Sequence, residues 1–531
     1  MSDQATPNGS AGAPPYPSGL PHPSVSSPPS LSERAVVALA VASTLVMAFA
    51  NLDVPSLWHD ELIHVYVGKR ILETGMPLLL SGRVFTNGTL FNYLLAGVIA
   101  LFGDGEAAVR SLSAFVGVVN VYVTYRVLRP LVGGPAAALT ALLMAWSPWQ
   151  LAWARQARFY MLHQTVYLVA ILLVWRFGHA DRSRIWRWVV GVAAVYGIGL
   201  LAGPQTVFFL GPIGAYAACR WMGARSIRSR WTALILMCAV LGAATLLGYY
   251  VSLPKAEHDA MFKEALKRDV PDEAMIDHDQ SDLLYYFRFY TNNLGSGYFL
   301  LACVGLALLV SRGGKGGLLV AVAFVAPLLA LNFGIPMNRR YRFLFFAYPF
   351  YVAACAYAMV FLARFVRTSR QSAWRIAAAF ALLVFAGRLA VSQYRLAKDC
   401  LEVAGGGSTT LAVHHPQWRQ PCAYVKEHCG DAAVLCTTYI AALYYVGKID
   451  DWYPSRVIVW EYIESGMDGM RTLEELQAFV SAHPRGYFIA EHRRFHMWPI
   501  FFKDDIEWVE ANMKRIDEAS NSDITVYSWG V

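Results

Sequence analysis

The stretch AVVALAVASTLVMAFA, from Ala35 to Ala50, is an apolar run inside the segment Leu31–Asn51. This segment is long enough to cross a bilayer, which takes about 20 residues. The loop after it contains LWHDELIHVY from Leu57 to Tyr66, so two carboxylates, Asp60 and Glu61, follow a membrane span directly. Carboxylates held just outside a membrane are suited to a reaction at the bilayer surface. We therefore take this pair as the candidate catalytic residues.

The overall composition is that of a membrane protein. Of the 531 residues, 56% are hydrophobic and only 15% are charged, and the mean hydropathy is +0.38. Soluble domains carry about 25% charged residues, so this chain is too apolar for a soluble protein of its size. We predict an α-helical polytopic membrane protein.

The first 30 residues differ from the rest. They contain eight prolines and many Ser and Gly, and Asp3 is their only charged side chain. Such a segment cannot bury enough apolar surface to order itself, and it lacks the charged n-region and cleavage site of a signal peptide. We predict a disordered cytoplasmic tail over 1–30 and a retained first span at Leu31–Asn51.

Ten further apolar stretches are candidate spans: 106–125, 134–150, 160–175, 188–203, 204–219, 231–252, 296–311, 317–333, 343–363 and 376–393. Five connecting segments carry 16 Arg or Lys and a single acid, namely 126–133, 176–187, 220–230, 312–315 and 364–375. The loop at 253–295 instead carries nine acids and five bases. By the positive-inside rule, the basic segments are cytoplasmic and the acidic loop is not. The formal charge of +8 is then a topology signal, and we expect no nucleic-acid partner.

The apolar residues 89–103 are an ambiguous segment. Counting them as a span would place Arg126 and Arg129 outside and would invert every later loop. We therefore predict a helix lying in the outer interface, and about 11 transmembrane helices in total. The outer loops 52–105 and 253–295 then share one compartment with the C-terminal region.

The C-terminal region, from residue 396, is soluble in character. Its apolar runs predict strands at Ala432–Thr438, Arg456–Trp460, Gly486–Glu491 and Ile524–Trp529, with helices at Thr472–His483 and Phe501–Met513. We predict a small extracytoplasmic α/β domain over 396–531, after a transmembrane domain over 31–395. Cys400, Cys422, Cys429 and Cys436 lie in it, where a disulfide would be permitted, although Cys436 in its strand fits a buried thiol better.

Charged side chains gather near the outer ends of the spans, and none lies near a span centre. This distribution argues against an ion-coupled transporter. Five arginines are candidates for binding a phosphate, because guanidinium forms forked, charge-assisted hydrogen bonds with that group; they are Arg155, Arg158, Arg339, Arg340 and Arg342. The alternative is that arginines at span ends reach for lipid headgroups.

Several other polar residues have competing interpretations. Asp60 precedes a plausible helix through Leu72 and could act only as its N-cap. His64, four residues later, is either a substrate contact or a packed surface residue. The tyrosines Tyr160, Tyr285 and Tyr290 are candidate substrate contacts, with an interfacial aromatic belt as the alternative for the last two.

A metal site is a weaker prediction. Asp277 and Asp279 have the oxygen ligands that a divalent cation such as Mg²⁺ prefers. A solvated acidic loop is the commoner explanation of such residues, so we expect no certain cofactor, with a divalent cation as the alternative.

Several motifs occur in an order that resembles a known family. They are Trp58-His59-Asp60-Glu61, Glu73-Thr74-Gly75, Leu101-Phe102-Gly103 followed by Arg110-Ser111-Leu112-Ser113, Ala154–Tyr160 and Arg342…Pro349. Together they resemble the GT-C membrane glycosyltransferases over roughly 31–395. The closest likeness is to the branch holding the dolichyl-phosphate-mannose protein mannosyltransferases and the lipid A aminoarabinose transferase.

The resemblance implies a reaction. Those families use a polyprenyl-phosphate sugar, invert the anomeric carbon and act outside the cytoplasm, with the position matching Asp60 as base and that matching Glu61 helping to hold the site. The sequence departs from the family at Phe85–Thr89 and at Gly203-Pro204-Gln205, so the acceptor does not carry over.

We therefore expect an inverting glycosyltransferase in a prokaryotic plasma membrane. Its partners would be a polyprenyl-phosphate-linked sugar, membrane lipid, and a lipid, glycan or protein acceptor. The alternative is a lipid-linked oligosaccharide flippase, which should carry charge along an intramembrane cavity.

Overall fold

The computed structural model describes residues 28–531 except 181–184, 224–227, 253–283, 335–339, 369–371, 402–414, 454–464, 468, 471 and 497–502. Most of the predicted tail, the acidic loop with Asp277 and Asp279, Arg339 and the predicted strand Arg456–Trp460 lie outside the described residues. The side chain of Cys400 is likewise not described.

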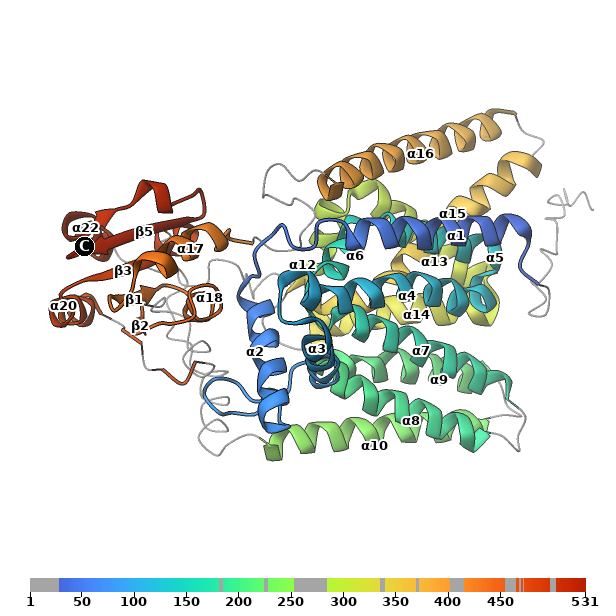
Figure 1. The fold of residues 1–531 in the computed structure, drawn as a ribbon. Helices are drawn as coiled ribbons and strands as arrows, with labels where there is room; N and C mark the ends of the chain where they lie inside the picture. Colours follow the sequence, from blue (N-terminus) through green and yellow to red (C-terminus); the bar gives the residue numbers. More distant parts are fainter. Residues whose placement is uncertain are drawn as a thin grey trace, which may run out of the picture.

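Most of the described chain is a bundle of antiparallel helices (Figure 1). Its elements are α1 (Leu31–Phe49), α4 (Glu106–Val132), α5 (Gly134–Ala145), α6 (Pro148–Ala154), α7 (Tyr160–His179), α8 (Ile185–Ala202), η2 (Pro204–Phe209), α9 (Leu210–Gly223), α10 (Arg228–Ser252), α12 (Tyr285–Arg288), η5 (Phe289–Asn293), α13 (Ser296–Arg312), α14 (Gly314–Leu329), η6 (Ala330–Gly334), η7 (Tyr341–Ala347), α15 (Tyr348–Thr368) and α16 (Ser372–Leu401). Helical structure is expected here, because only internally bonded backbone is stable across a bilayer.

All eleven predicted spans are helical, but they differ in length. In the described part of the chain, eight helices are long and apolar enough to cross a membrane, and the bent pair Tyr285–Asn293 and Ser296–Arg312 would be a ninth. Helices α5 and α9 have only 12 and 14 residues; α6 follows the first and η2 precedes the second. A polytopic membrane fold is confirmed, whereas the count of eleven stays a prediction.

Two helices do not follow the direction of the bundle. Helix α2 (His59–Thr74) crosses its end, and α3 (Thr89–Phe102) is seen nearly end-on beside it (Figure 1). Fourteen residues of α-helix extend only about 21 Å, which is shorter than the apolar core of a bilayer. This geometry fits the predicted interfacial helix at 89–103.

The C-terminal domain contains a mixed five-stranded sheet in the order β2-β1-β3-β5-β4. The strands are β1 (Ala433–Cys436), β2 (Asp451–Trp452), β3 (Gly486–Glu491), β4 (Lys514–Arg515) and β5 (Ile524–Trp529), and β1 runs parallel to both neighbours while β5 is antiparallel to β3 and β4. The helices are α17 (Arg419–His428), α18 (Tyr439–Tyr445), α20 (Leu473–Ala482), α21 (His492–Phe495) and α22 (Lys503–Asn512), with a 3-10 turn η8 (Asp517–Ala519). Three predicted strands and both predicted helices are present.

Both faces of this sheet are buried. Val434, Cys436 and Ile489 belong to the core that is continuous with the bundle, whereas Leu435 and Phe488 belong to a second core on the opposite face. Alternate residues of a strand point to opposite faces, which explains the division. Cys422, Cys429 and Cys436 are buried free thiols.

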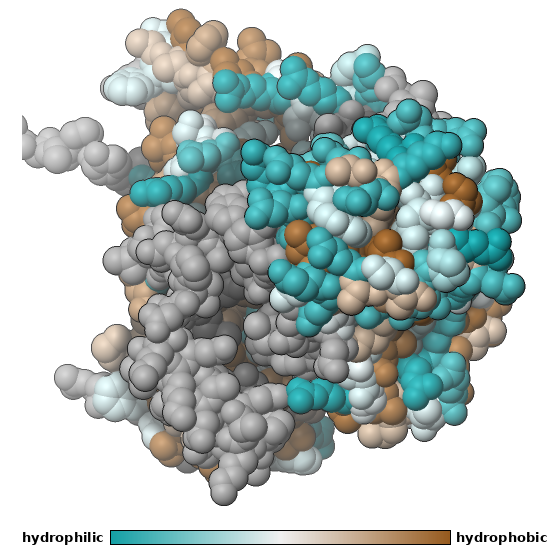
Figure 2. Space-filling model, turned by 90° about the vertical axis from the view of Figure 1, so that its left-hand side faces the viewer, coloured by the Kyte–Doolittle hydropathy of each residue, from teal (hydrophilic) through white to brown (hydrophobic). Residues whose placement is uncertain are grey.

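The surface changes character between the two parts. The outward face of the C-terminal domain is mainly hydrophilic (Figure 2). Helix α16 instead exposes large apolar side chains, among them Trp374, Phe380 and Leu383. An apolar exterior suits a helix that faces lipid. The surface of the bundle at α16 thus differs from the hydrophilic surface of the C-terminal domain.

Candidate active site

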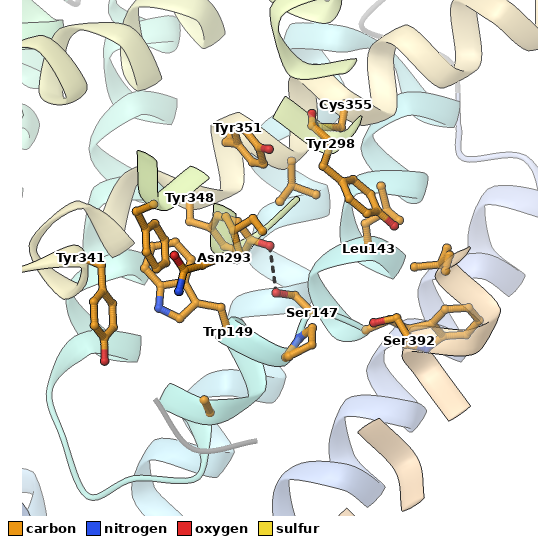
Figure 3. Close-up of a pocket in the computed structure, with 17 residues that line it drawn as sticks. Leu143, Ser147, Trp149, Asn293, Tyr298, Tyr341, Tyr348, Tyr351, Cys355 and Ser392 are labelled. Atoms are coloured by element: carbon orange, nitrogen blue, oxygen red, sulfur yellow. Dashed lines mark hydrogen bonds between the residues drawn. The ribbon is translucent and has the colours of Figure 1, made fainter. Parts of the chain in front are cut away.

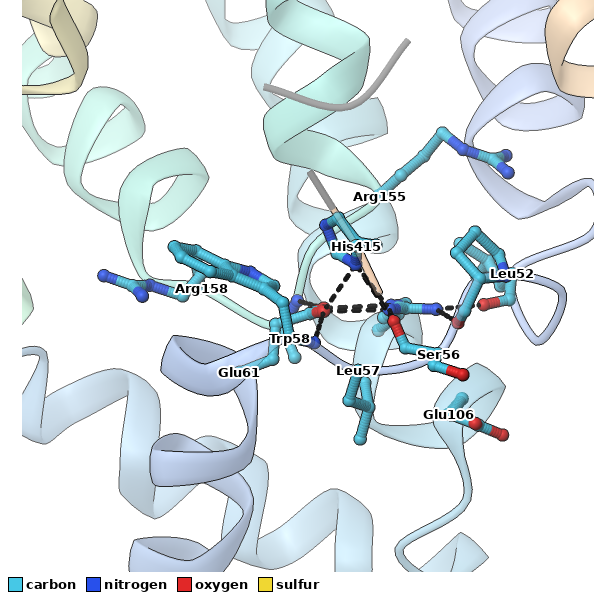
Figure 4. Close-up of polar contacts among 12 residues, drawn as sticks. Leu52, Ser56, Leu57, Trp58, Glu61, Glu106, Arg155, Arg158 and His415 are labelled. Atoms are coloured by element: carbon cyan, nitrogen blue, oxygen red, sulfur yellow. Dashed lines mark hydrogen bonds and ion pairs between the residues drawn. The ribbon is translucent and has the colours of Figure 1, made fainter. Parts of the chain in front are cut away.

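Glu61 forms a fully buried ion pair with Arg110 (Figure 4). Arg110 Nε donates to Glu61 Oε1 at 2.9 Å, and Nη2 donates to Oε2 at 2.8 Å. This forked geometry is the strongest arrangement for an arginine and a carboxylate. The pair joins the first turn of α2 to the first turn of α4.

Two backbone amides complete the surroundings of the Glu61 carboxylate. The Ala157 N–H donates to Oε1 at 2.7 Å, and the Trp58 N–H donates to Oε2 at 3.3 Å. Burial by itself raises the pKa of Glu61, but the charge and hydrogen bonds of Arg110 outweigh it and lower the pKa below its ordinary value. Glu61 is therefore an ionised structural group, closed to solvent.

Asp60 has a different environment, although it is the preceding residue. Its side chain is 24% exposed, and Oδ2 forms ion pairs with Arg158 Nη1 and with Arg342 Nη1, the latter at 3.2 Å. Burial is the main cause that lowers the pKa of Arg158 to about 10, and the nearby charges of Arg342 and Arg340 act in the same direction; Arg158 therefore remains positive at neutral pH. Asp60 is thus an accessible carboxylate between two cations.

The structure does not make Asp60 the N-cap of α2. The cap is Trp58, and the carboxylate that bonds to its N–H is that of Glu61. The simple capping interpretation of Asp60 is therefore wrong, and its carboxylate is directed to Arg158 and Arg342 instead.

The five predicted phosphate-binding arginines do not form one group. Arg155 points away from Arg158 (Figure 4) and donates to the carbonyls of Met47, Ala50 and Asn51 at the end of α1. Unpaired carbonyls at a helix end need such donors, which gives Arg155 a structural role. The carbonyl of Arg340 accepts a hydrogen bond from Tyr286 at 3.1 Å, and Arg339 is outside the described residues.

The other predicted contacts are distributed around the site. Tyr160 accepts a hydrogen bond from Arg158 Nη2 at 3.3 Å, so it belongs to the group at Asp60. His64 is buried among Phe85, Phe91 and Phe159, with Nδ1 at 2.5 Å from Asn92 Oδ1. Its ring is therefore held by packing rather than facing Asp60.

An aromatic cavity of about 430 Å³ lies beside η7, between α6, α13, α15 and α16 (Figure 3). Its walls include Trp149, Phe289, Tyr341, Tyr348 and Tyr351. Tyr341 stacks on Phe289 with ring centroids 5.1 Å apart, and it is the residue before Arg342. One wall of the cavity is therefore formed by the residue that precedes the arginine paired with Asp60.

Tyr285 and Tyr290 lie near this cavity without being in its lining. The Tyr285 hydroxyl accepts from the Tyr341 N–H at 3.3 Å, and the fully buried Tyr290 packs on Tyr351 with centroids 4.6 Å apart. Both tyrosines support the cavity wall.

No group of three His, Cys, Asp or Glu side chains among the described residues is arranged to hold a metal ion. Asp277 and Asp279 fall outside that part of the chain.

Two residues of the site were missed as site residues from the sequence. Arg110 was seen only as an arginine near a span end and as part of a family motif. His415 lies in a segment with no recognisable motif, and its Nδ1 is 3.4 Å from Glu61 Oε2. Only the packing of the C-terminal domain on the bundle reveals it.

Comparisons with known proteins identify the fold. Residues 87–249 match the family model described as dolichyl-phosphate-mannose-protein mannosyltransferase, and no curated protein matches the sequence. The crystal structure of ArnT from Cupriavidus metallidurans bound to undecaprenyl phosphate aligns with a TM-score of 0.62 and 14% identity, over 93% of this chain and 98% of that chain.

A second solved structure agrees. The archaeal oligosaccharyltransferase AglB from Archaeoglobus fulgidus, in complex with an inhibitory peptide and a dolichol-phosphate, aligns with a TM-score of 0.60 and 13% identity, over 91% of this chain and 72% of that chain. At such identities the likeness concerns the fold. The fold is that of the GT-C membrane glycosyltransferases, as the order of the sequence motifs predicted.

Proposed function

We propose that this chain transfers a sugar from a polyprenyl-phosphate donor to an acceptor at the membrane surface, with Asp60 as the general base. The observation that carries this proposal is the partly exposed Asp60 carboxylate paired with Arg158 and Arg342 at the end of a helical bundle. Such a group combines a proton acceptor with the cations that a departing phosphate requires.

The division of labour between the two acids follows from their environments. Glu61 is enclosed by Arg110 and two backbone amides, so it has no access to a substrate. The contacts of Arg158 and Arg342 with Asp60 both fall on Oδ2, so Oδ1 is the oxygen turned away from these ion pairs. That oxygen is available to accept a proton from an acceptor hydroxyl or amine.

Arg158 and Arg342 support the donor assignment. When a donor phosphate binds, the two arginines can break their ion pairs with Asp60 and bind the phosphate oxygens instead. The Asp60 carboxylate is then released to act as base. The aromatic cavity beside Arg342 offers an apolar surface for the first part of an isoprenoid chain. The ArnT and AglB structures contain undecaprenyl phosphate and dolichol-phosphate respectively, which is in keeping with this donor class.

The proposed step is a single displacement. The acceptor oxygen or nitrogen attacks the anomeric carbon, its proton moves to Asp60, and the bond between that carbon and the phosphate oxygen breaks with its electron pair on the polyprenyl phosphate. Attack opposite the leaving group inverts the anomeric carbon. Arg158 and Arg342 neutralise the negative charge as it develops on the phosphate.

The flippase alternative has less support. Apart from Arg110 near the beginning of α4, the buried polar residues inside the described spans, such as Asn120 and Gln164, carry no charge, and the charged pairs lie at the ends of the bundle. A path for a charged lipid headgroup would require charge deeper in the membrane.

The proposal is tested with purified protein, polyprenyl-phosphate sugars and candidate acceptors, with products identified by mass spectrometry. Asp60→Asn keeps the size of the side chain but cannot take a proton at neutral pH. We expect turnover to fall by at least about 10²-fold, the lower end for loss of a general base, with little change in donor affinity. Asp517→Asn, which alters an exposed carboxylate paired with Arg515, is the matched control. Normal transfer by the Asp60→Asn protein would refute the assignment of the base.

A further inference from the structure

The loop that carries the candidate base is held from inside the bundle by one arginine. Arg110 Nη1 donates to the carbonyls of Leu52 at 2.8 Å and Pro55 at 2.6 Å, and Nη2 donates to the carbonyl of Ser56 at 3.0 Å. Arg110 therefore fixes both the loop and Glu61. These contacts determine where α2 begins.

The C-terminal domain holds the same loop from the other side. The Trp418 N–H donates to Ser56 Oγ at 3.1 Å, and the Tyr445 hydroxyl accepts from the Leu57 N–H at 2.7 Å. His415 Nδ1 lies 3.0 Å from the Ser56 carbonyl. Three residues of the domain thus bind two consecutive residues of the loop.

His415 is the member of this group that reaches the buried ion pair. Its side chain is 2% exposed, and Nδ1 lies 3.4 Å from Glu61 Oε2 (Figure 4). The Ser56 carbonyl, at 3.0 Å, is the nearest partner of Nδ1 and can only accept a hydrogen bond, so Nδ1 carries the hydrogen, and Arg110 Nη2, at 3.4 Å, is a neighbour that does not donate to it. His415 is therefore a donor to the Ser56 carbonyl of the loop, and its ring lies beside the Glu61 carboxylate.

We propose that His415 is a positioning residue, through which the C-terminal domain fixes the first turn of α2 and so the direction of Asp60. The inference rests on the proposed function of Asp60. The domain is then a part of the catalytic site, in addition to any role in receiving the acceptor.

His415 can affect Asp60 because the residues held by these contacts are close to Asp60 in the chain. Ser56, Leu57 and Glu61 are held by groups outside α2, and Asp60 lies between them in sequence. A displacement of about 1 Å in a catalytic group can reduce a rate by about 10²-fold. Loss of the His415 contact is milder, because Arg110 still holds the loop, so we expect a loss of about tenfold.

Two substitutions of His415 separate positioning from folding. His415→Leu keeps an apolar volume but removes the donor, whereas His415→Asn places an amide N–H near the position of Nδ1. We expect His415→Leu to lower kcat about tenfold, with the acceptor KM and donor affinity within about twofold of wild type, and His415→Asn to recover most of the loss. Equal kcat losses in both variants, or a raised acceptor KM with normal kcat, would overturn the proposal.

A second variant tests the same loop without altering His415. Tyr445→Phe removes the hydroxyl that binds Leu57 and donates to Glu106 at 2.9 Å. Because both residues hold one loop, the double variant with His415→Leu should lose less than the product of the two single losses. Strictly multiplicative losses would contradict a shared positioning role.

Hydrogen exchange separates this inference from the proposed function, since it needs no substrate. Backbone amides of residues 57–66 should exchange faster in His415→Leu than in wild type, and at the wild-type rate in His415→Asn. His483→Leu is the control, because His483 Nδ1 binds only the carbonyl of Phe479 inside the domain. Unchanged exchange in His415→Leu would refute the positioning role, whereas inactive wild-type protein with the expected exchange pattern would refute only the proposed function.

Discussion

At the scale of single residues, Asp60 and Glu61 show how adjacent acids take different roles. Glu61 is buried and satisfied by four hydrogen bonds, and Asp60 is partly exposed between two arginines. A buried, fully paired carboxylate stabilises local structure, and breaking such a pair is costly. An exposed carboxylate beside cations is free to exchange partners with a substrate.

The first prediction at this scale concerns the donor phosphate. Arg342→Ala should weaken donor binding about ten- to hundredfold, because it removes a charge-assisted contact of about 1.5–3 kcal/mol. Arg342→Lys should restore it only in part, since a point charge cannot reproduce the fork. Donor affinity is measured by equilibrium binding of a fluorescent polyprenyl phosphate. The control is Arg126→Ala, which alters an exposed arginine of α4 far from the end of that helix that carries Arg110, and it should leave the donor affinity unchanged. Equal losses of affinity in the two alanine variants would contradict the assignment.

The second prediction at this scale concerns pH and His64. Burial lowers the pKa of His64 to about 4, while the hydrogen bond with Asn92 acts in the opposite direction. As the pH falls, His64 therefore binds a proton in the unfolded chain before it does so in the folded protein. The free energy of unfolding then decreases as the pH drops from 6.5 towards 4. Between pH 7 and pH 5 the loss amounts to about 2 kcal/mol.

The measurement is the unfolding midpoint in detergent at those two pH values. His64→Gln cannot titrate, so its stability should change much less over this range. His428→Gln, which alters an exposed histidine, should retain the wild-type pH dependence. A wild-type slope in His64→Gln would show that other groups cause the loss.

At the scale of elements, a buried amide network connects the segments that carry the two arginines. Gln150 of α6 donates to Asn120 of α4 and to Gln164 of α7, each at 3.0 Å. Gln164 in turn donates to the carbonyl of Phe345 in η7 at 2.9 Å. Arg158 follows α6 and Arg342 lies in η7, so this network fixes their separation.

The prediction for this network is a coupled loss of stability and donor affinity. Gln164→Leu should lower the free energy of unfolding by about 1–2 kcal/mol, because it breaks two buried hydrogen bonds. It should also weaken donor binding several-fold, because η7 loses its hydrogen bond with Gln164 of α7. Thr140→Val is the control, because Thr140 bonds only to the Ala136 carbonyl of its own helix. Normal donor affinity in a destabilised Gln164→Leu protein would limit the network to a role in folding.

At the scale of the whole molecule, the two ends of the bundle differ, and the candidate catalytic residues lie at one of them. Asp60, α2 and the C-terminal domain lie at that end, and the junctions α4–α5, α7–α8, α9–α10 and α15–α16 lie at the other (Figure 1). The latter junctions belong to four of the five basic segments. The alternation seen in the sequence thus corresponds to two opposite ends in space.

The prediction at this scale assigns those ends to compartments. Single cysteines are introduced into a cysteine-free variant at Glu510 in the C-terminal domain and at Arg312, the last residue of α13, both exposed. By the positive-inside rule, a membrane-impermeant maleimide should label the cysteine at 510 in intact cells and that at 312 only after permeabilisation. The reverse pattern would invert the topology and place Asp60 in the cytoplasm.

Part of this architecture could be predicted from residues alone, because the signals are local. Apolar runs such as Ala35–Ala50 define helices whatever surrounds them, and short apolar runs predicted β3 and β5 with their observed bounds. The order of short motifs predicted the GT-C fold. Periodicity did not reveal the two-residue strands β2 and β4, which exist only through pairing with their neighbours.

The sequence by itself therefore determined the membrane fold and the C-terminal α/β domain, and it proposed the Asp60–Glu61 pair as the candidate site. Only the tertiary structure decided which acid is enclosed and which is accessible, that Arg155 serves the end of α1, and that His415 reaches Glu61 across more than 350 positions of chain. The reason is physical: burial, ion pairing and accessibility depend on side chains brought together from distant segments. Hydrophobic patterns record which residues avoid water, but they do not record which charged groups meet.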